Sequence, residues 1–154
     1  MSKNRPSHGN KTIESRGAAL IDSGAWIALF SSRDQHHIEA ERLFREAIKG
    51  RALMLTTNLV VAEVHRLLLF RAGQRAAATA LERIEASPSV QIEFATAAHH
   101  RAARSWMDKL APHSVTYTDA VSFAMMESFG CAEVLSFDNA FVIAGFTKRK
   151  SSPL

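Results

Sequence analysis

The stretch Ala18-Ala19-Leu20-Ile21-Asp22 is a short apolar run that ends in a carboxylate. Small and aliphatic residues in a run of this length are typical of a strand that is buried on both faces of a parallel sheet. A carboxylate in such a setting is unfavourable without a partner, because desolvating an isolated charge costs several kcal/mol or more. The position of Asp22 therefore predicts a compensating group nearby.

Three further acids are set into apolar segments in the same way. They are Glu63 within the aliphatic segment 59–64, Asp119 at the start of segment 119–126, and Asp138 directly after segment 134–137. Most of the other acids lie in mixed-charge stretches, which a solvated surface explains. If the four carboxylates converge, they need a cation, so the pattern predicts a metal site before any family is considered.

The composition fits one globular domain. A chain of 154 residues can bury a sizeable core, and its 47% hydrophobic and 22% charged residues are ordinary for a globular protein. The formal net charge of +4 and the pI near 9.6 are compatible with a polyanionic partner but do not require one.

The two ends of the chain differ from its middle. We expect residues 1–17 to be a disordered leader, residues 18–147 the folded domain, and residues 148–154 a basic tail. The leader has no apolar core of a secretory signal, and no run of about 18 apolar residues predicts a membrane span. A single cysteine, Cys131, excludes an internal disulfide and fits a reducing compartment, so we expect a cytoplasmic protein.

Strand and helix signals alternate along the chain. Strands are predicted at residues 18–22, 52–56, 90–94 and 133–136, with a weaker signal at 145–147. Helices are predicted at residues 36–49, 58–72, 74–86, 97–110 and 118–129. Short aliphatic strands between helices predict an α/β fold, a single three-layer α/β/α domain with a mainly parallel central sheet.

The predicted elements place the acids in relation to one another. In open parallel sheets, ligands bind beyond the carboxyl ends of the strands, where the strand order switches. Asp22 and Asp138 each follow a strand, so we expect them at the same rim. Asp119 lies in the first turn of a helix, where the helix dipole favours a carboxylate even without a function. Glu63 lies on or beside the apolar stripe of its helix, where an ion pair with Arg66 is the alternative.

Clustered carboxylates indicate a particular chemistry. They repel one another and raise each other's pKa values unless a divalent cation compensates, and all-oxygen ligands suit Mg²⁺ or Mn²⁺. Such ions polarise phosphoryl oxygens and activate water, so the pattern favours phosphodiester hydrolysis. We expect Asp22 and Asp119 to bind the metal directly and Asp138 and Glu63 to complete the site. The number of metal ions, one or two, stays open.

Three neighbouring polar residues are candidates for a supporting role. Ser23 and Thr118 flank two of the acids and would either orient the carboxylates or simply cap helices. Asn139 would touch a phosphate or turn the chain. Trp26 and Trp106 are predicted to pack in the core or a dimer interface rather than to stack on bases.

Five motifs follow one another in order along the chain: Leu20-Ile21-Asp22-Ser23-Gly24, Asp34-Gln35-His36-His37, Ala62-Glu63-Val64, Thr118-Asp119-Ala120 and Ser136-Phe137-Asp138-Asn139. With these motifs the sequence resembles a PIN-domain ribonuclease, most closely a VapC-type toxin of a toxin–antitoxin pair. The resemblance covers about residues 18–147. It implies a sheet with helices on both faces, a divalent metal held by the four acids, and cleavage of RNA to 3′-hydroxyl and 5′-phosphate ends. It also implies a homodimer that a cognate antitoxin inhibits.

One position departs from the family pattern. Many relatives have a histidine two residues after the fourth acid, and Ala140 stands there instead. The alternative function is therefore a catalytically silent PIN-like module that binds RNA or protein. Other aspartate-based phosphotransferases fit less well. A nucleophile-type phosphohydrolase usually has a second acid where Gly24 stands, and a receiver module has paired acids where Ser23 follows Asp22.

Overall fold

The computed structural model describes residues 17–153, so the predicted leader lies outside the described residues except for Gly17. In this range the strands are β1 (Ala19–Ile21), β2 (Met54–Thr57), β3 (Val90–Glu93), β4 (Glu133–Leu135) and β5 (Thr147–Lys148). The helices are α1 (Ser23–Phe30), α2 (His37–Lys49), α3 (Asn58–Ala72), α4 (Gln74–Ala86), α5 (Ala97–Leu110), α6 (Tyr117–Phe129) and α7 (Ala140–Ile143).

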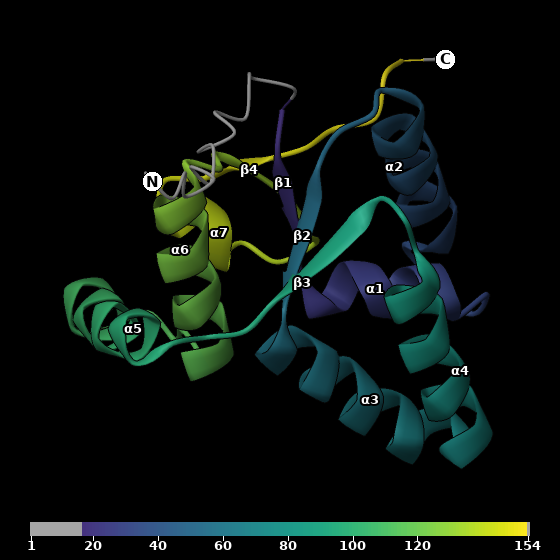
Figure 1. The fold of residues 1–154 in the computed structure, drawn as a ribbon, viewed down its shortest axis with the longest axis horizontal. Helices are drawn as coiled ribbons and strands as arrows, with labels where there is room; N and C mark the ends of the chain where they lie inside the picture. The colour runs from purple at the N-terminus through teal and green to yellow at the C-terminus, as the bar shows by residue number, and fades with distance from the viewer. Residues whose placement is uncertain (1–16, 154) are drawn as a thin grey trace, which may run out of the picture.

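The five strands form one sheet in the order β3-β2-β1-β4-β5. Every neighbouring pair is parallel, with β1 between β2 and β4. Helices α1 to α4 lie on one side of the sheet and α5 to α7 on the other (Figure 1). The predicted three-layer α/β/α architecture is confirmed.

Two hydrophobic clusters, one on each face of the sheet, form the core. Ala19 and Ile21 of β1 belong to the cluster under α1–α4, and Leu20 belongs to the cluster under α5–α7. Successive side chains of a strand point to opposite faces, so β1 contributes to both clusters. This is why the sequence of β1 is apolar without alternation.

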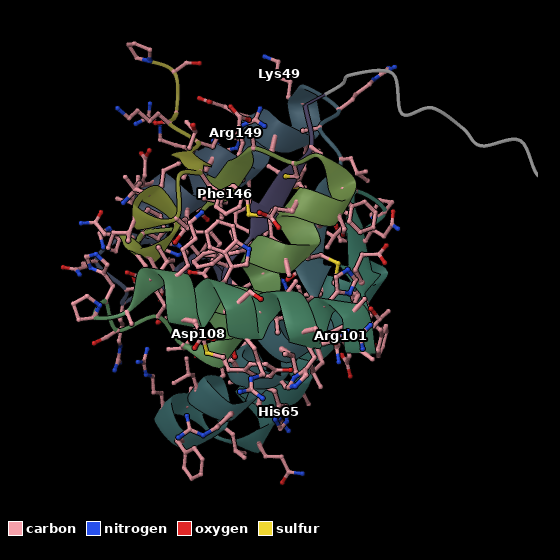
Figure 2. The ribbon with its side chains drawn as sticks, turned by 90° about the vertical axis from the view of Figure 1, so that its left-hand side faces the viewer. Lys49, His65, Arg101, Asp108, Phe146 and Arg149 are labelled. Atoms are coloured by element: carbon pink, nitrogen blue, oxygen red, sulfur yellow. The ribbon has the colours of Figure 1, made fainter. Side chains whose placement is uncertain are left out.

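Both tryptophans pack inside the protein, as predicted. Trp26 is 3% exposed, and its ring packs at a tilt against Phe44, with ring centroids 5.0 Å apart. On the opposite face, Trp106 packs edge-on against Phe123 at 5.4 Å, and Phe146 completes that aromatic group. Figure 2 looks onto this second face, with α5 crossing the view below the labelled Phe146.

The predicted boundaries of α3, α4 and α5 agree with the structure, whereas two helices were missed. In α1 the residues Ala25 to Ala28 are all buried, so this helix is apolar on every side and shows no helical period. Helix α7 is a single turn of four residues. The last strand starts at Thr147 rather than at Gly145, whose φ of +96° places it in a turn.

The segment that follows β5 lies against helix α2. The Ser151 hydroxyl donates to Glu39 at 2.7 Å, the Ser152 amide donates to Glu46 at 3.1 Å, and Arg42 donates to the Ser152 carbonyl at 2.9 Å. These contacts involve residues of the predicted basic tail. Within residues 17–153, no helix combines the length and apolar character needed to cross a membrane.

Candidate active site

The strand order places the candidate site at the centre of the sheet. The chain steps outward from β1 to β2 and β3, then returns to the other side of β1 to form β4 and β5. The switch point therefore lies between β1 and β4, which is where open α/β sheets bind ligands. The Asp22 amide donates to the Leu135 carbonyl at 3.0 Å and joins the ends of these two strands.

An open hollow of about 400 Å³ lies at this switch point, and all four predicted acids line it. Its lining residues are Asp22, Ser23, Gly24, Glu63, Thr116, Asp119, Phe137 and Asp138. They come from four separate parts of the chain: the β1–α1 junction, the middle of α3, the start of α6 and the segment after β4. The predicted convergence of the acids is present, and their catalytic and metal-binding roles stay predictions.

Asp22 is the most buried of the four, with 4% of its surface exposed. It caps α1, and its Oδ1 accepts a hydrogen bond from the Ser23 amide at 2.8 Å. Its Oδ2 accepts from the Ser136 hydroxyl at 3.0 Å. Burial, and then the nearby charge of Asp119, raise the pKa of Asp22 to about 7, although the hydrogen bonds from Ser23 and Ser136 lower it.

Asp119 is both a helix cap and part of the hollow. Its Oδ2 accepts from the Thr116 amide at 3.2 Å, and its own amide donates to the Thr116 hydroxyl at 3.1 Å, which forms a capping box at the start of α6. Burial raises the pKa of Asp119; the Thr116 hydrogen bonds oppose that shift, and the charges of Asp138 and Glu63 add to it. The helix cap therefore uses only Oδ2 of Asp119. Its other oxygen, Oδ1, accepts no hydrogen bond in the described part of the chain.

Glu63 and Asp138 are more accessible to solvent. Glu63 is half-buried on α3, and no ion pair joins it to Arg66 within the described residues. The Arg66 guanidinium instead lies 5.9 Å from the centre of the Phe70 ring. Asp138 is exposed, and its Oδ1 accepts from the Ala140 amide at 3.3 Å. The alternative expectation of a Glu63–Arg66 pair is therefore not met.

The predicted supporting residues fall in different places. Ser23 lines the hollow, but its contact with Asp22 is made by the backbone amide. Thr118 makes no side-chain hydrogen bond among the described residues. The position that orients Asp119, which we had expected for Thr118, is occupied by Thr116. Asn139 lies outside the lining of the hollow and accepts a hydrogen bond from Lys148 Nζ at 3.3 Å.

Two functional contacts were missed in the sequence. Thr116 stands three residues before Asp119, which is the spacing of a capping box, so this contact was detectable. Ser136 lies between the end of β4 and Asp138, and nothing local indicates that its hydroxyl reaches Asp22. Its partner depends on the pairing of β1 with β4.

The donor set of the hollow suits a hard divalent cation, because its charged ligands are all carboxylate oxygens. Burial raises the pKa of Asp22, and the negative charges of Asp119 and Glu63 raise it further. As the side chains stand, residues 17–153 contain no group of three or more His, Cys, Asp or Glu arranged to hold a metal ion. The residue types fit a cation, whereas the carboxylates as placed do not form such a group.

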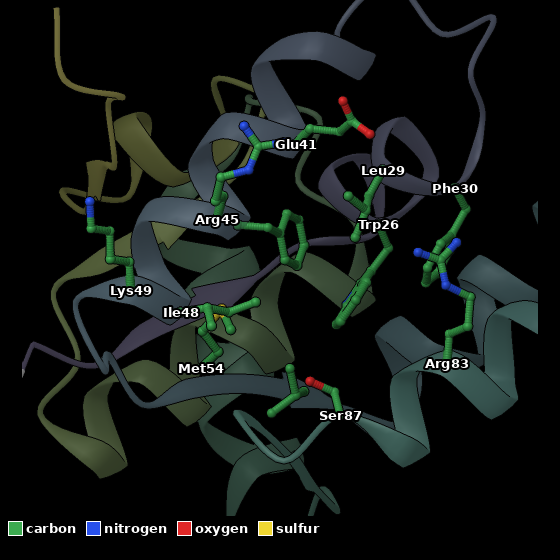
Figure 3. Close-up of a pocket in the computed structure, with 12 residues that line it drawn as sticks. Trp26, Leu29, Phe30, Glu41, Arg45, Ile48, Lys49, Met54, Arg83 and Ser87 are labelled. Atoms are coloured by element: carbon green, nitrogen blue, oxygen red, sulfur yellow. The ribbon is translucent and has the colours of Figure 1, made fainter.

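A second hollow, of about 520 Å³, lies between α1, α2 and α4 (Figure 3). Trp26, Phe44 and Met54 give it an apolar floor, and Arg45 and Arg83 stand at its rim. Its lining contains one carboxylate, Glu41, so it lacks the acid cluster that metal chemistry requires. The hollow at the switch point is therefore the candidate active site.

Comparisons with known proteins give a consistent picture. The sequence pattern of the PIN domain matches residues 19–146. Proteins from two strains of Mycobacterium tuberculosis, both named 23S rRNA-specific endonuclease VapC20, are 35% identical over 129 residues, which are 84% of this chain and 95% of theirs. A crystal structure of the M. tuberculosis protein, described as a sarcin–ricin loop cleaving toxin, matches with a TM-score of 0.79 and 31% identity. That match covers 86% of this chain and 98% of the crystallised chain.

Proposed function

The chain belongs to the PIN-domain family, and we propose that it is an endoribonuclease toxin that hydrolyses RNA at the switch-point hollow. The observation that carries this proposal is the convergence of Asp22, Glu63, Asp119 and Asp138 on one hollow. A silent binding module has no need for all four acids at one place. The similarity to a named endonuclease over 95% of its length also favours catalysis.

We further propose that Mg²⁺ or Mn²⁺ is the cofactor. Asp22 and Asp119 would hold the ion directly, and Glu63 and Asp138 would complete the site, because these four side chains are the acids of the hollow. A bound divalent ion supplies neutralisation of phosphate charge and activation of water. The raised pKa of Asp22 is consistent with this assignment: burial is its main cause, and the nearby charges of Asp119 and Glu63, which a cation would offset, add to it.

The residues of the hollow would have two kinds of role. The Ser136 hydroxyl and the Ser23 amide hold both oxygens of Asp22, and the Thr116 amide holds one oxygen of Asp119. These contacts fix the orientation of the two buried acids. Glu63 and Asp138 are less buried. They are therefore better placed to rotate toward an attacking water and to accept its proton.

The substrate that we propose is a structured loop of ribosomal RNA. The M. tuberculosis relatives are named for cleavage of 23S rRNA, and the crystallised one for cleavage of the sarcin–ricin loop. The net charge of +4 supports a polyanionic substrate. We also propose a cognate antitoxin as the partner and a homodimer as the assembly, on the basis of the family.

The decisive experiment is cleavage of an oligonucleotide with the sarcin–ricin loop sequence by the purified protein. We expect cutting with Mg²⁺ or Mn²⁺, none with EDTA, and none by Asp119→Asn. Asp108→Asn is the matched control, because Asp108 is an exposed acid on α5 outside the hollow (Figure 2). A folded, antitoxin-free protein that cuts neither this loop nor other RNAs would favour the silent module instead.

Growth measurements test the toxin assignment separately. Expression of the wild-type chain should arrest bacterial growth, and expression of Asp119→Asn should not. Equal toxicity of the two proteins would exclude catalysis as the cause.

A further inference from the structure

The rings of His36 and Phe137 are stacked beside the acidic hollow. Their centroids are 4.3 Å apart and their planes differ by 4°. His36 is the residue before α2, and Phe137 belongs to the segment after β4. Two distant parts of the chain therefore meet in one aromatic pair.

Phe137 is placed by the same segment that positions the acids. It stands between Ser136, which holds Asp22, and Asp138. Among the residues that line the hollow it is the only aromatic one, and the other lining residues are acids, hydroxyl residues and a glycine. The hollow thus combines a polar, acidic part with one flat apolar ring.

The backbone of His36 is fixed by local hydrogen bonds. Its amide donates to Asp34 Oδ1 at 2.8 Å, and Nδ1 of the next residue, His37, lies 2.7 Å from the Ala28 carbonyl. Within residues 17–153 the imidazole nitrogens of His36 form no hydrogen bond and no ion pair. The main interaction of the His36 ring within the described residues is therefore its stacking on Phe137, the aromatic residue that lines the hollow.

A flat ring beside a phosphodiester site fits a nucleobase. Proteins recognise single-stranded and looped RNA by stacking unpaired bases on aromatic and histidine rings. Without a bound cation the acidic hollow repels phosphate, so contacts to other parts of the nucleotide would add to the affinity for RNA. Phe137 is half-buried and also packs against the hydrophobic cluster under α1–α4. A base next to the scissile phosphate would contact the part of the Phe137 ring that lines the hollow.

We propose that His36 and Phe137 form a stacking platform for one nucleobase adjacent to the scissile phosphate. This inference rests on the proposed endoribonuclease function. His36 and Phe137 are positioning residues, because they hold the substrate and take no part in proton or phosphoryl transfer.

The test compares ring-removing and ring-keeping variants. His36→Ala and Phe137→Leu remove one ring each, whereas His36→Phe keeps a planar ring and removes the ring nitrogens. We expect KM for the loop oligonucleotide to rise roughly tenfold in the first two, with kcat nearly unchanged, because stacking contributes mainly to binding. His36→Phe should stay within about threefold of wild type on the same basis.

Binding and stability controls accompany these kinetics. In an Asp119→Asn background, the same variants should show the same losses in RNA affinity by fluorescence anisotropy. His65→Ala is the matched histidine control, because two residues after Glu63 on a helix the side chain points to the opposite side. Thermal midpoints verify folding, and the His36 variants alone decide the question if Phe137→Leu is unstable.

An abasic scan of the oligonucleotide identifies the base. Removal of one base beside the cleavage site should weaken binding to wild type roughly tenfold and have a smaller further effect on Phe137→Leu, because that variant lacks the ring that the base would contact. Unchanged binding and KM in His36→Ala, with an active wild type, would overturn the platform and leave the endoribonuclease intact. A His36→Phe variant as weak as His36→Ala would also overturn it, because the nitrogens would then be responsible. A wild type that cuts no RNA would instead refute the proposed function itself.

Discussion

The Ser136 hydroxyl donates a 3.0 Å hydrogen bond to Asp22, a residue 114 positions earlier in the chain. The same oxygen accepts a hydrogen bond from the Asp138 amide at 3.0 Å. One small side chain at the end of β4 therefore fixes an acid at the end of β1 and the backbone of a second acid. The contact exists because β1 and β4 are neighbours in the sheet.

Replacing Ser136 by alanine should impair catalysis and shift its pH dependence. The Ser136 hydrogen bond lowers the pKa of Asp22, so its loss should raise that pKa further above the present value of about 7. A lost hydrogen bond to a charged group is worth about 1.5–3 kcal/mol, so kcat/KM near neutral pH should fall at least about tenfold. Part of the loss should be recovered at higher pH, where Asp22 ionises. The measurement is the pH profile of RNA cleavage.

Ser105→Ala is the control for this variant. The Ser105 hydroxyl donates to the Arg101 carbonyl on exposed α5, remote from the hollow lining. A Ser136→Ala protein with the wild-type profile would show that the hydroxyl does not tune Asp22.

Thr116 and Thr118 form a matched pair for testing the helix cap. Thr116→Ala removes the capping box of α6 and should destabilise the protein by about 1 kcal/mol. Thr118→Ala removes no side-chain hydrogen bond of the described residues and should leave the stability nearly unchanged. Denaturant unfolding of both variants checks this. Equal losses in the two would contradict the assignment of the cap to Thr116.

Asp22→Asn should make the metal-free protein more stable at alkaline pH. The pKa of Asp22 is raised from 3.8 to about 7, so the folded wild type binds a proton that the unfolded chain has released between these values. The contribution of Asp22 to the free energy of unfolding is therefore greatest below pH 3.8. It falls as the pH rises and is lowest above about pH 7. The shift corresponds to at most about 4 kcal/mol.

The measurement is the thermal midpoint in EDTA at about pH 8 and about pH 5. The asparagine variant should melt higher at the alkaline pH, by roughly 2–4 °C for each kcal/mol relieved, and the difference should shrink at the acidic pH. The exposed control Asp108→Asn should move the midpoint little at either pH. An Asp22→Asn protein that is much less stable at alkaline pH would mark Asp22 as a structural acid.

Metal binding should be visible without any RNA. Mn²⁺ at concentrations well above its dissociation constant should raise the thermal midpoint of the wild type, because a ligand that binds only the folded state stabilises it. Asp22→Asn should lose most of this effect. Binding near pH 6 should also release a proton, since Asp22 is largely protonated there.

Calorimetric titration with Mn²⁺ in buffers of different ionisation enthalpy measures the number of protons released on binding. The release should decline as the pH is raised above 7. Identical Mn²⁺ affinity and proton release in wild type and Asp22→Asn would place the ion elsewhere.

Local sequence patterns determined most of the elements and the identity of the acids. The bounds of α3, α4 and α5 follow from periodicity and capping residues, which depend on neighbours three or four positions away. The apolar run before Asp22 indicated a strand buried on both faces, and its side chains do enter both hydrophobic clusters. Charges set into such runs were sufficient to select the four acids that line the hollow.

Only the tertiary structure decided how these parts meet. Helix α1 has buried residues on every side, so its sequence lacks the periodic signal that would have revealed it. The stacking of His36 on Phe137 and the hydrogen bond from Ser136 to Asp22 join residues far apart in the chain. Both contacts depend on the strand order β3-β2-β1-β4-β5. That order results from packing the whole chain into one sheet, and no local spacing specifies it.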